Sequence, residues 1–154
     1  MGIIKAAKLA FDYLRYEEEG EEPEVNRAID HVDLDIEEGK FIAILGHNGS
    51  GKSTLLHMLG GLDRPTTGKV MVDGKDIFSL SEERLTIFRR RKIGFVFQSY
   101  NLVPVLNLYE NIVLPLELDG KKIDREYIDQ IAETLGLKDR LEALPNQLSG
   151  GQQQ

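Results

Sequence analysis

The sequence predicts an α/β fold, and three patterns along the chain support this prediction. A short apolar run, Phe41–Leu45, leads through a glycine-rich loop into a stretch with helical periodicity. Alternating apolar and polar residues flank the dipeptide Asp73-Gly74, a pairing that favours a hairpin of antiparallel strands. Apolar residues recur at helical spacing after Asp124. We therefore expect an α/β core accompanied by an antiparallel β part and a helical part.

The β part is expected from two stretches. In Ile29–Ile36 the apolar side chains fall mostly on one face, which predicts a half-buried strand. Lys69–Val72 and Lys75–Ile77 flank the turn at Asp73-Gly74 and predict a hairpin. The acidic stretch Glu17–Pro23 also contains glycine and proline, so we expect a solvated loop between strands there.

The later elements are predicted by their end signals. Ser79 precedes Glu82 by three residues, which favours a helix N-terminus at Ser79. Ile93–Phe97 is rich in β-formers and predicts a buried strand. Helical character is expected from Ser99 onward, including a helix that Asp124 caps and Gly136 ends. Leu137–Leu144 is expected to form a short helix broken by Pro145.

The glycine-rich loop has the pattern G-x-x-x-x-G-K-[ST], running from Gly46 to Ser53 between the predicted strand and helix. Glycine lacks a Cβ, so the backbone N–H groups can approach a phosphate, and the following helix adds its positive dipole end. Lys52 would reach the β and γ phosphates, and the Ser53 hydroxyl suits Mg²⁺. The loop thus predicts an ATP and Mg²⁺ site formed by Gly46, Asn48, Gly49, Ser50, Gly51, Lys52, Ser53 and Thr54.

A second glycine-rich turn, Leu148–Gln152, lies about a hundred residues further along. Together the two motifs resemble the ATP-binding cassette family, the motor subunits of ABC transporters. Gly46–Thr54 resembles the family's Walker A motif, and Leu148–Gln152 resembles its signature motif. Gln98 resembles the Q-loop glutamine, and Tyr13 resembles the aromatic residue that stacks on adenine. The resemblance covers essentially the whole chain.

The resemblance implies roles for these residues. Tyr13 would stack on the base, with Tyr16 as the competing candidate and simple strand packing as the other explanation. Gln98 would bind Mg²⁺ or hold the attacking water, and Lys52 would act on the phosphates. In the family, the signature turn contacts the γ-phosphate bound by the opposite subunit of a head-to-tail dimer. Here that turn corresponds to Ser149, Gly150, Gly151 and Gln152. The implied partners are a second ATPase subunit and a transmembrane permease.

The resemblance also predicts that the P-loop NTPase core is incomplete. The family's Walker B strand with its catalytic glutamate, and its later switch histidine, have no match in this sequence. We therefore expect ATP binding with little or no hydrolysis by this chain. Residues 1–98 are expected to form the β subdomain with the P-loop core, and residues 99–154 the helical subdomain with the signature motif.

Subfamily signals are mixed. Gly60–Gly68, Arg91–Gln98 and Pro145–Gln154 resemble the lipoprotein-release and macrolide-export group. Ile44–Gly49, with the acidic insertion before it, resembles the energy-coupling-factor importers. Two other functions remain open, namely a non-hydrolysing nucleotide-binding or dimerisation module and another P-loop enzyme such as a small-molecule kinase. The signature turn argues against the kinase.

Composition limits the function classes. The net charge of −7 argues against a nucleic-acid partner, and the run Arg89–Lys92 is expected to be a solvated helix end. No apolar run approaches the ~18 residues needed to span a bilayer, and cysteine is absent. We therefore expect a cytoplasmic protein that meets the inner face of the membrane through a permease. Residues 101–106 would be either a docking surface for that permease or packing beneath a loop.

Overall fold

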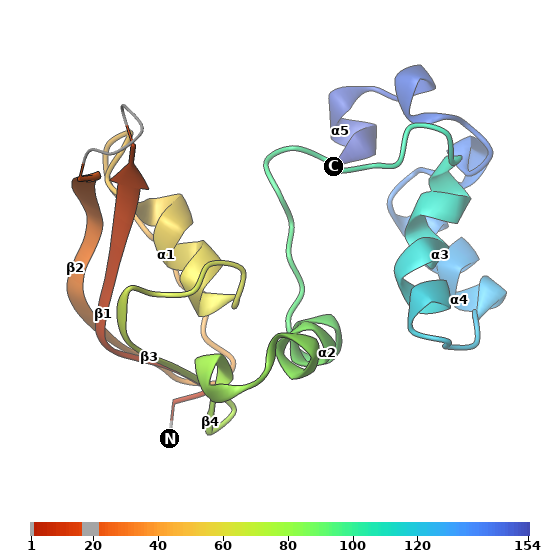
Figure 1. The fold of residues 1–154 in the computed structure, drawn as a ribbon. Helices are drawn as coiled ribbons and strands as arrows, with labels where there is room; N and C mark the ends of the chain where they lie inside the picture. Colours follow the sequence, from red (N-terminus) through yellow and green to blue (C-terminus); the bar gives the residue numbers. More distant parts are fainter. Residues whose placement is uncertain (1, 17–21) are drawn as a thin grey trace. The chain divides into compact units, whose positions relative to one another are not determined.

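The computed structural model describes residues 2–16 and 22–154, which form an α/β structure as predicted (Figure 1). The chain divides into two compact units, Met1–Phe95 and Val96–Gln154. Most of the acidic loop predicted at residues 17–23 lies outside the described residues.

Within the described residues, the first unit contains an antiparallel sheet in the order β2-β1-β3-β4. Its strands are β1 (Ile4–Arg15), β2 (Glu24–Ile36), β3 (Thr67–Val72) and β4 (Lys75–Asp76). The predicted hairpin is confirmed, with Asp73 and Gly74 at φ values of 50° and 73° between β3 and β4. The half-buried strand predicted at residues 29–36 is confirmed as part of β2.

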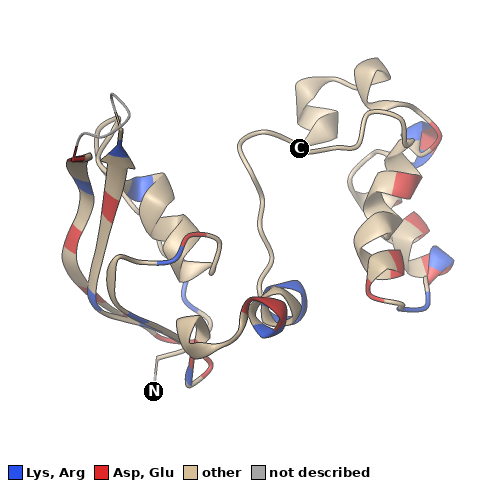
Figure 2. Ribbon diagram, viewed as in Figure 1, with Lys and Arg blue, Asp and Glu red and all other residues tan. Residues whose placement is uncertain are grey.

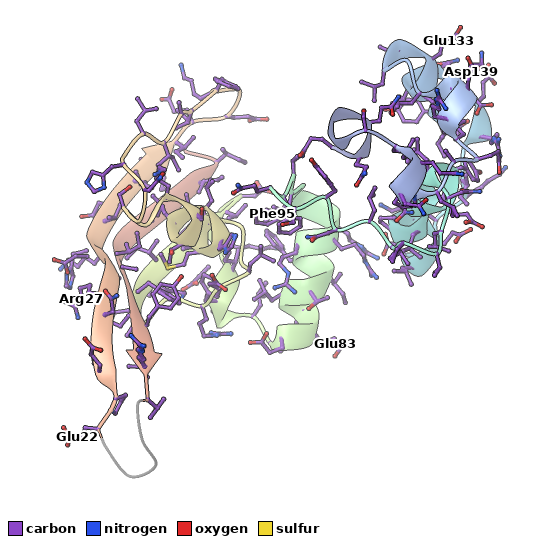
Figure 3. All side chains as sticks on the ribbon, turned by 90° about the horizontal axis from the view of Figure 1, so that it is seen from above. Glu22, Arg27, Glu83, Phe95, Glu133 and Asp139 are labelled. Carbon is purple, nitrogen blue, oxygen red and sulfur yellow. The ribbon has the colours of Figure 1, made fainter. Side chains whose placement is uncertain are left out.

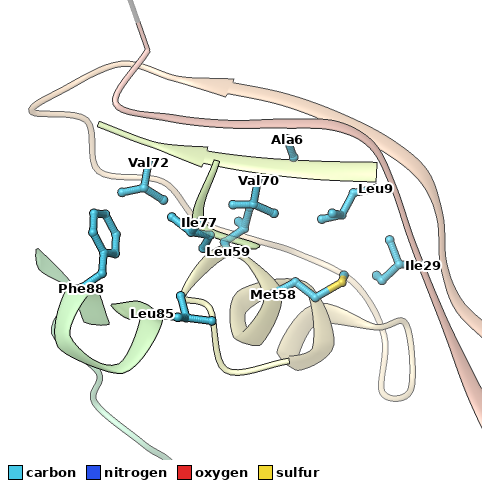
Figure 4. Close-up of a cluster of buried hydrophobic side chains, with 10 residues drawn as sticks. All are labelled: Ala6, Leu9, Ile29, Met58, Leu59, Val70, Val72, Ile77, Leu85 and Phe88. Atoms are coloured by element: carbon cyan, nitrogen blue, oxygen red, sulfur yellow. The ribbon is translucent and has the colours of Figure 1, made fainter. Parts of the chain in front are cut away.

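Two helices of the first unit complete its hydrophobic core (Figure 4). They are α1 (Lys52–Leu59) and α2 (Glu82–Lys92). Met58 of α1 meets side chains of the sheet such as Leu9 and Val70, and all three are fully buried. Leu85 and Phe88 extend the core along α2. This packing fixes α1, and therefore the loop before it, against the sheet.

The prediction of two buried strands, at Phe41–Leu45 and Ile93–Phe97, is wrong. Neither segment has regular structure, and Phe41, Leu45 and Val96 are 98%, 90% and 81% exposed. A strand needs a hydrogen-bonding neighbour to form a ladder, and none of the described strands pairs with either segment. Apolar, β-branched composition predicted strands correctly only where such a neighbour is present.

The helix predicted to start at Ser79 starts later. Ser81 caps α2, and its Oγ accepts a hydrogen bond of 3.4 Å from the backbone N of Arg84. Ser79 instead ends the 3-10 turn η1 (Ile77–Ser79), where its Oγ donates to the carbonyl of Asp76 at 2.7 Å. Two serines compete here, and only Ser81 directly precedes the first helical residue.

The basic run at the end of α2 lies near the negative end of the helix dipole, where cations are favoured (Figure 2). Arg89 donates to the carbonyl of Gly61 at 2.7 Å, and Lys92 pairs with Asp73 at 3.2 Å. Arg89 is thus a structural link between α2 and the turn that ends α1.

The second unit is helical. Its helices are α3 (Leu108–Leu118), α4 (Arg125–Thr134) and α5 (Gly150–Gln153), joined by the 3-10 turns η2 (Lys138–Arg140) and η3 (Pro145–Gln147). A small core links these elements, formed by Leu108, Ala132, Leu141 and Leu148. Among the described residues, no helix is both long and apolar enough to span a bilayer.

The helical predictions were partly right. The helix capped by Asp124 is confirmed as α4, and Gly136 follows its end with a φ of 67°. Residues 99–106 are not helical, because α3 begins only after Asn107. Residues 137–144 contain only the short 3-10 turn η2 in place of the predicted helix.

Candidate nucleotide-binding site

The loop of residues 46–53 is shaped by a close contact with β2. Gly51 is the N-cap of α1 and has a φ of 83°. A Cβ at this position would lie 2.6 Å from the carbonyl oxygen of Ala28 and 2.8 Å from Cδ1 of Ile29. Both the backbone conformation and the space therefore require glycine.

The N-terminus of α1 is available to an anion. Among the described side chains, none caps this end, and no acidic residue lies in the first turn. The first N–H groups of a helix have no partner within it, and they carry the positive end of the helix dipole. A phosphate or another anion is therefore favoured at this position.

Lys52 is held across the loop. Its ammonium donates to the carbonyl oxygens of Gly46 at 2.8 Å and His47 at 2.7 Å, and lies 3.4 Å from Oγ of Ser50. These bonds place a positive charge over the loop, beside the N-terminus of α1. The loop carbonyls of Gly46 and His47 thus hold the lysine ammonium at the loop.

A pocket of about 390 Å³ joins the loop to the β1–β2 hairpin. Its lining comprises Tyr13, Asn26, Arg27, Ala28 and residues 49–54. The structure therefore brings together Tyr13, Gly49, Ser50, Gly51, Lys52, Ser53 and Thr54 of the predicted site. Gly46 and Asn48 lie just outside this lining, in the same loop. Tyr16 also lies outside the lining and is 68% exposed.

The ring of Tyr13 stands at the edge of this pocket. Its hydroxyl oxygen lies within hydrogen-bond distance, 3.0 Å, of Oγ1 of Thr54. The ring of Phe11 meets it edge-on, with centroids 4.9 Å apart and planes at 73°. The Tyr13 side of the pocket thus offers an aromatic surface, as adenine stacking requires.

Arg27 lies on the β1–β2 hairpin (Figure 3). It forms an ion pair with Asp12. Its Nε and Nη2 donate to the two carboxylate oxygens at 2.8 and 3.2 Å. The hydrogen bond from Arg27 lowers the pKa of Asp12 below its ordinary value, and the same contact raises the pKa of Arg27. Arg27 also lines the pocket, so the ion pair with Asp12 ties one wall of the pocket to β1.

A magnesium ion suits the pocket without a dedicated metal cage. Mg²⁺ in nucleotide sites takes one or two protein oxygens, with phosphates and water completing its shell. The exposed Ser53 lines the pocket, and its hydroxyl would supply such an oxygen to a bound Mg²⁺ ion. The described residues contain no group of three or more His, Cys, Asp or Glu side chains able to hold a metal.

The remaining predicted residues belong to the second unit. Gln98 is exposed in an irregular segment. Ser149 caps α5, and its backbone N donates to Oε1 of Gln152 at 2.9 Å. Gly150 and Gly151 form the first turn of α5. A Cβ on Gly150 would lie 2.8 Å from the hydroxyl of Tyr100, so this tyrosine supports the turn. Sequence reasoning missed Tyr100, although it closely follows Gln98.

Comparisons with known proteins identify the family. The family model described as ABC transporter matches residues 29–154. An ABC transporter ATP-binding protein of Thermotoga maritima is 50% identical over 129 residues, which are 82% of this chain and 55% of that protein. The macrolide export ATP-binding/permease protein MacB of Brucella abortus is 47% identical over 125 residues, covering 80% of this chain and 19% of MacB.

A solved structure is also similar. The ATP-binding cassette MJ0796, as a dimer bound to ADP and Pi, superposes with a TM-score of 0.82 at 40% identity, covering 97% of this chain and 65% of that one. The chain spans about half the length of the T. maritima relative. The resemblance to the macrolide-export group is confirmed by MacB. From the matched family model and these relatives, the chain belongs to the ABC transporter family as part of an ATP-binding domain.

Proposed function

We propose that this chain binds MgATP and that, in a full-length assembly, ATP binding and hydrolysis drive transport across a membrane. The observation that carries the proposal is the pocket shared by Tyr13 and residues 49–54. It combines an aromatic surface for a base with a helix N-terminus and a lysine for phosphates. In this arrangement Lys52 contacts the β and γ phosphates, and Ser53 provides an oxygen to Mg²⁺.

We infer little or no hydrolysis by the chain alone. Phosphoryl transfer depends on a positioned water and on stabilisation of charge on the γ-phosphate. The described lining of the pocket includes no Asp or Glu that could polarise that water. Gln98 is the chain's candidate for binding the Mg²⁺ ion or for holding the attacking water. A purely non-hydrolysing nucleotide-binding or dimerisation module is the alternative that this lining favours.

The proposed partners are a second ATPase subunit and a transmembrane permease. MJ0796 forms a dimer, and MacB unites ATP-binding and permease parts in one protein. By analogy, Ser149, Gly150, Gly151 and Gln152 would meet the γ-phosphate bound by the opposite subunit. A small-molecule kinase has no use for such a turn. Through a permease, the chain would sit at the cytoplasmic face of the membrane.

Calorimetry with MgATP tests the binding proposal. The chain as it stands should bind MgATP, and Lys52→Ala should weaken binding at least about tenfold, because a charge-assisted contact to phosphate is lost. Lys69→Ala removes the same charge from β3, outside the pocket, and should bind normally. Absence of MgATP binding by folded protein would contradict the proposal.

Phosphate release measured on the same samples tests the inference about hydrolysis. Little or no phosphate should appear with MgATP present. Magnesium-dependent turnover that disappears in Lys52→Ala would show that the chain hydrolyses ATP unaided, and the inference would then be wrong. Transfer of phosphate to a metabolite would favour the kinase.

A further inference from the structure

We propose that Thr54 is a positioning residue that fixes the ring of Tyr13 before nucleotide arrives. The two side chains come from different elements, β1 and α1, and their oxygens lie 3.0 Å apart. The hydrogen bond between them ties the base end of the pocket to its phosphate end. This inference rests on the proposed function, because it concerns how the same pocket recognises the base.

Thr54 is well suited to act as an anchor. It is only 7% exposed and lies in the first turn of α1. Four residues later on the same helix, Met58 is fully buried in the core of the first unit. The Thr54 hydroxyl is therefore attached to a helix that packing against the core holds in place. A hydroxyl on an exposed side chain would instead change position with the rotamer of that side chain.

Phe11 provides a second restraint on the ring. Its edge-on contact with Tyr13 fixes the side of the ring, while the bond to Thr54 fixes its tip. Tyr13 nevertheless remains 49% exposed and lines the pocket. The ring is thus held in place and still accessible, and a binding surface that is ordered beforehand loses less side-chain entropy when a ligand binds.

This arrangement gives the tyrosine hydroxyl its own role. Stacking needs only an aromatic face, which phenylalanine supplies equally well. Only tyrosine can reach the hydroxyl of Thr54. If the bond orients the ring, its loss should weaken recognition of a base and leave recognition of phosphates unchanged. A neutral hydrogen bond of this kind corresponds to about a fivefold change in affinity.

The test compares two ligands, MgATP and magnesium tripolyphosphate, which lacks the base. Dissociation constants for both are measured by calorimetry on the wild-type chain and on four variants, Tyr13→Phe, Thr54→Val, Thr54→Ser and the double variant Tyr13→Phe/Thr54→Val. Tyr16→Phe serves as the matched control, because Tyr16 lies outside the pocket. The readout is the preference for MgATP, which is the ratio of the dissociation constants for tripolyphosphate and MgATP. An effect of Thr54 on phosphate binding alone changes both constants equally and therefore leaves this ratio unchanged.

We expect the preference for MgATP to fall about fivefold in Tyr13→Phe and Thr54→Val, and no further in the double variant, since both remove the same bond. Thr54→Ser keeps the hydroxyl and should restore the wild-type preference, as should Tyr16→Phe. An unchanged preference in Tyr13→Phe, additive losses in the double variant, or an equal loss of tripolyphosphate binding in Tyr13→Phe would each overturn the inference. If the folded wild type bound neither ligand, the proposed function would fail as well; ATP binding with an unchanged preference would overturn the positioning role alone.

Discussion

Gly51 lies so close to Ala28 that a Cβ added to Gly51 would be 2.6 Å from the Ala28 carbonyl oxygen. The contact joins the phosphate-binding loop directly to β2, and Ile29, the next residue of that strand, belongs to the core. The position of the loop therefore depends on the sheet as well as on the helix that follows it. A side chain at Gly51 would push these elements apart.

Replacing Gly51 by alanine should therefore be strongly destabilising. The left-handed backbone at a φ of 83° costs alanine about 1–2 kcal/mol, and the clash with β2 adds about 1–3 kcal/mol. Gly49→Ala is the matched control. Gly49 has a φ of 78°, but a Cβ there meets nothing within 4 Å, so only the cost of about 1–2 kcal/mol for the left-handed backbone remains. Urea unfolding of both variants measures the difference, and equal losses would contradict the close contact.

Helix α1 contributes Met58 to the hydrophobic core of the first unit. Met58→Ala should lower the free energy of unfolding by about 2–5 kcal/mol, because Met58 is fully buried against β1 and β3 and alanine leaves a cavity. Leu56→Ala, on the same helix, removes a side chain that is 51% exposed and should cost below about 1 kcal/mol. Thermal unfolding followed by circular dichroism compares the two. Similar melting temperatures would mean that α1 does not pack as described.

The sequence predicted well those features that depend on neighbouring residues. Asp124 and Gly136 mark the ends of α4, and Asp73-Gly74 forms the hairpin turn between β3 and β4. Both kinds of feature were predictable because caps and turns follow from local backbone chemistry. The loop glycines were predicted for the same reason. In contrast, the strand prediction at Phe41–Leu45 used composition alone. Strand formation depends on a partner that composition does not reveal.

Local sequence patterns also failed to predict some contacts between residues of the candidate site. The motif predicted residues 46–54, and resemblance predicted Tyr13, but neither indicated the contact between Tyr13 and Thr54, 41 residues apart along the chain. The support of Gly150 by Tyr100 was missed for the same reason. The start of α3 was predictable, because Asn107 and Glu110 form a capping box. That signal was present in the sequence and was overlooked.

A helix cap in the second unit gives the next prediction. Oδ1 of Asp124 accepts a hydrogen bond from the backbone N of Tyr127 at 3.1 Å. Asp124→Ala should lower the free energy of unfolding by about 1 kcal/mol, because this N–H loses its partner. Glu126→Ala removes the same charge from the first turn of α4 without removing the cap, and should cost less. Urea unfolding measures the free energy of unfolding of both variants. Equal losses would show that Asp124 stabilises the helix through its charge and not through the capping hydrogen bond.

An ion pair between Arg27 and Asp12 links the two strands of the β1–β2 hairpin. Arg27 holds both carboxylate oxygens of Asp12, and this hydrogen bonding lowers the pKa of Asp12 below its ordinary value of 3.8. A carboxylate with a lowered pKa in the folded state stabilises the protein fully above its unfolded pKa. That contribution is lost as the pH falls through the folded pKa.

Arg27→Gln should therefore raise the pKa of Asp12 toward 3.8 and shift acid unfolding to higher pH. The carboxyl resonance of Asp12, followed by NMR during an acid titration, measures the pKa directly. Arg84→Gln is a charge-matched control on α2, because the basic groups that lower the pKa of Asp12 are Arg27 and His31. A pKa that stays the same in Arg27→Gln, or that rises as much in Arg84→Gln, would show that general charge rather than the bidentate contact sets this titration.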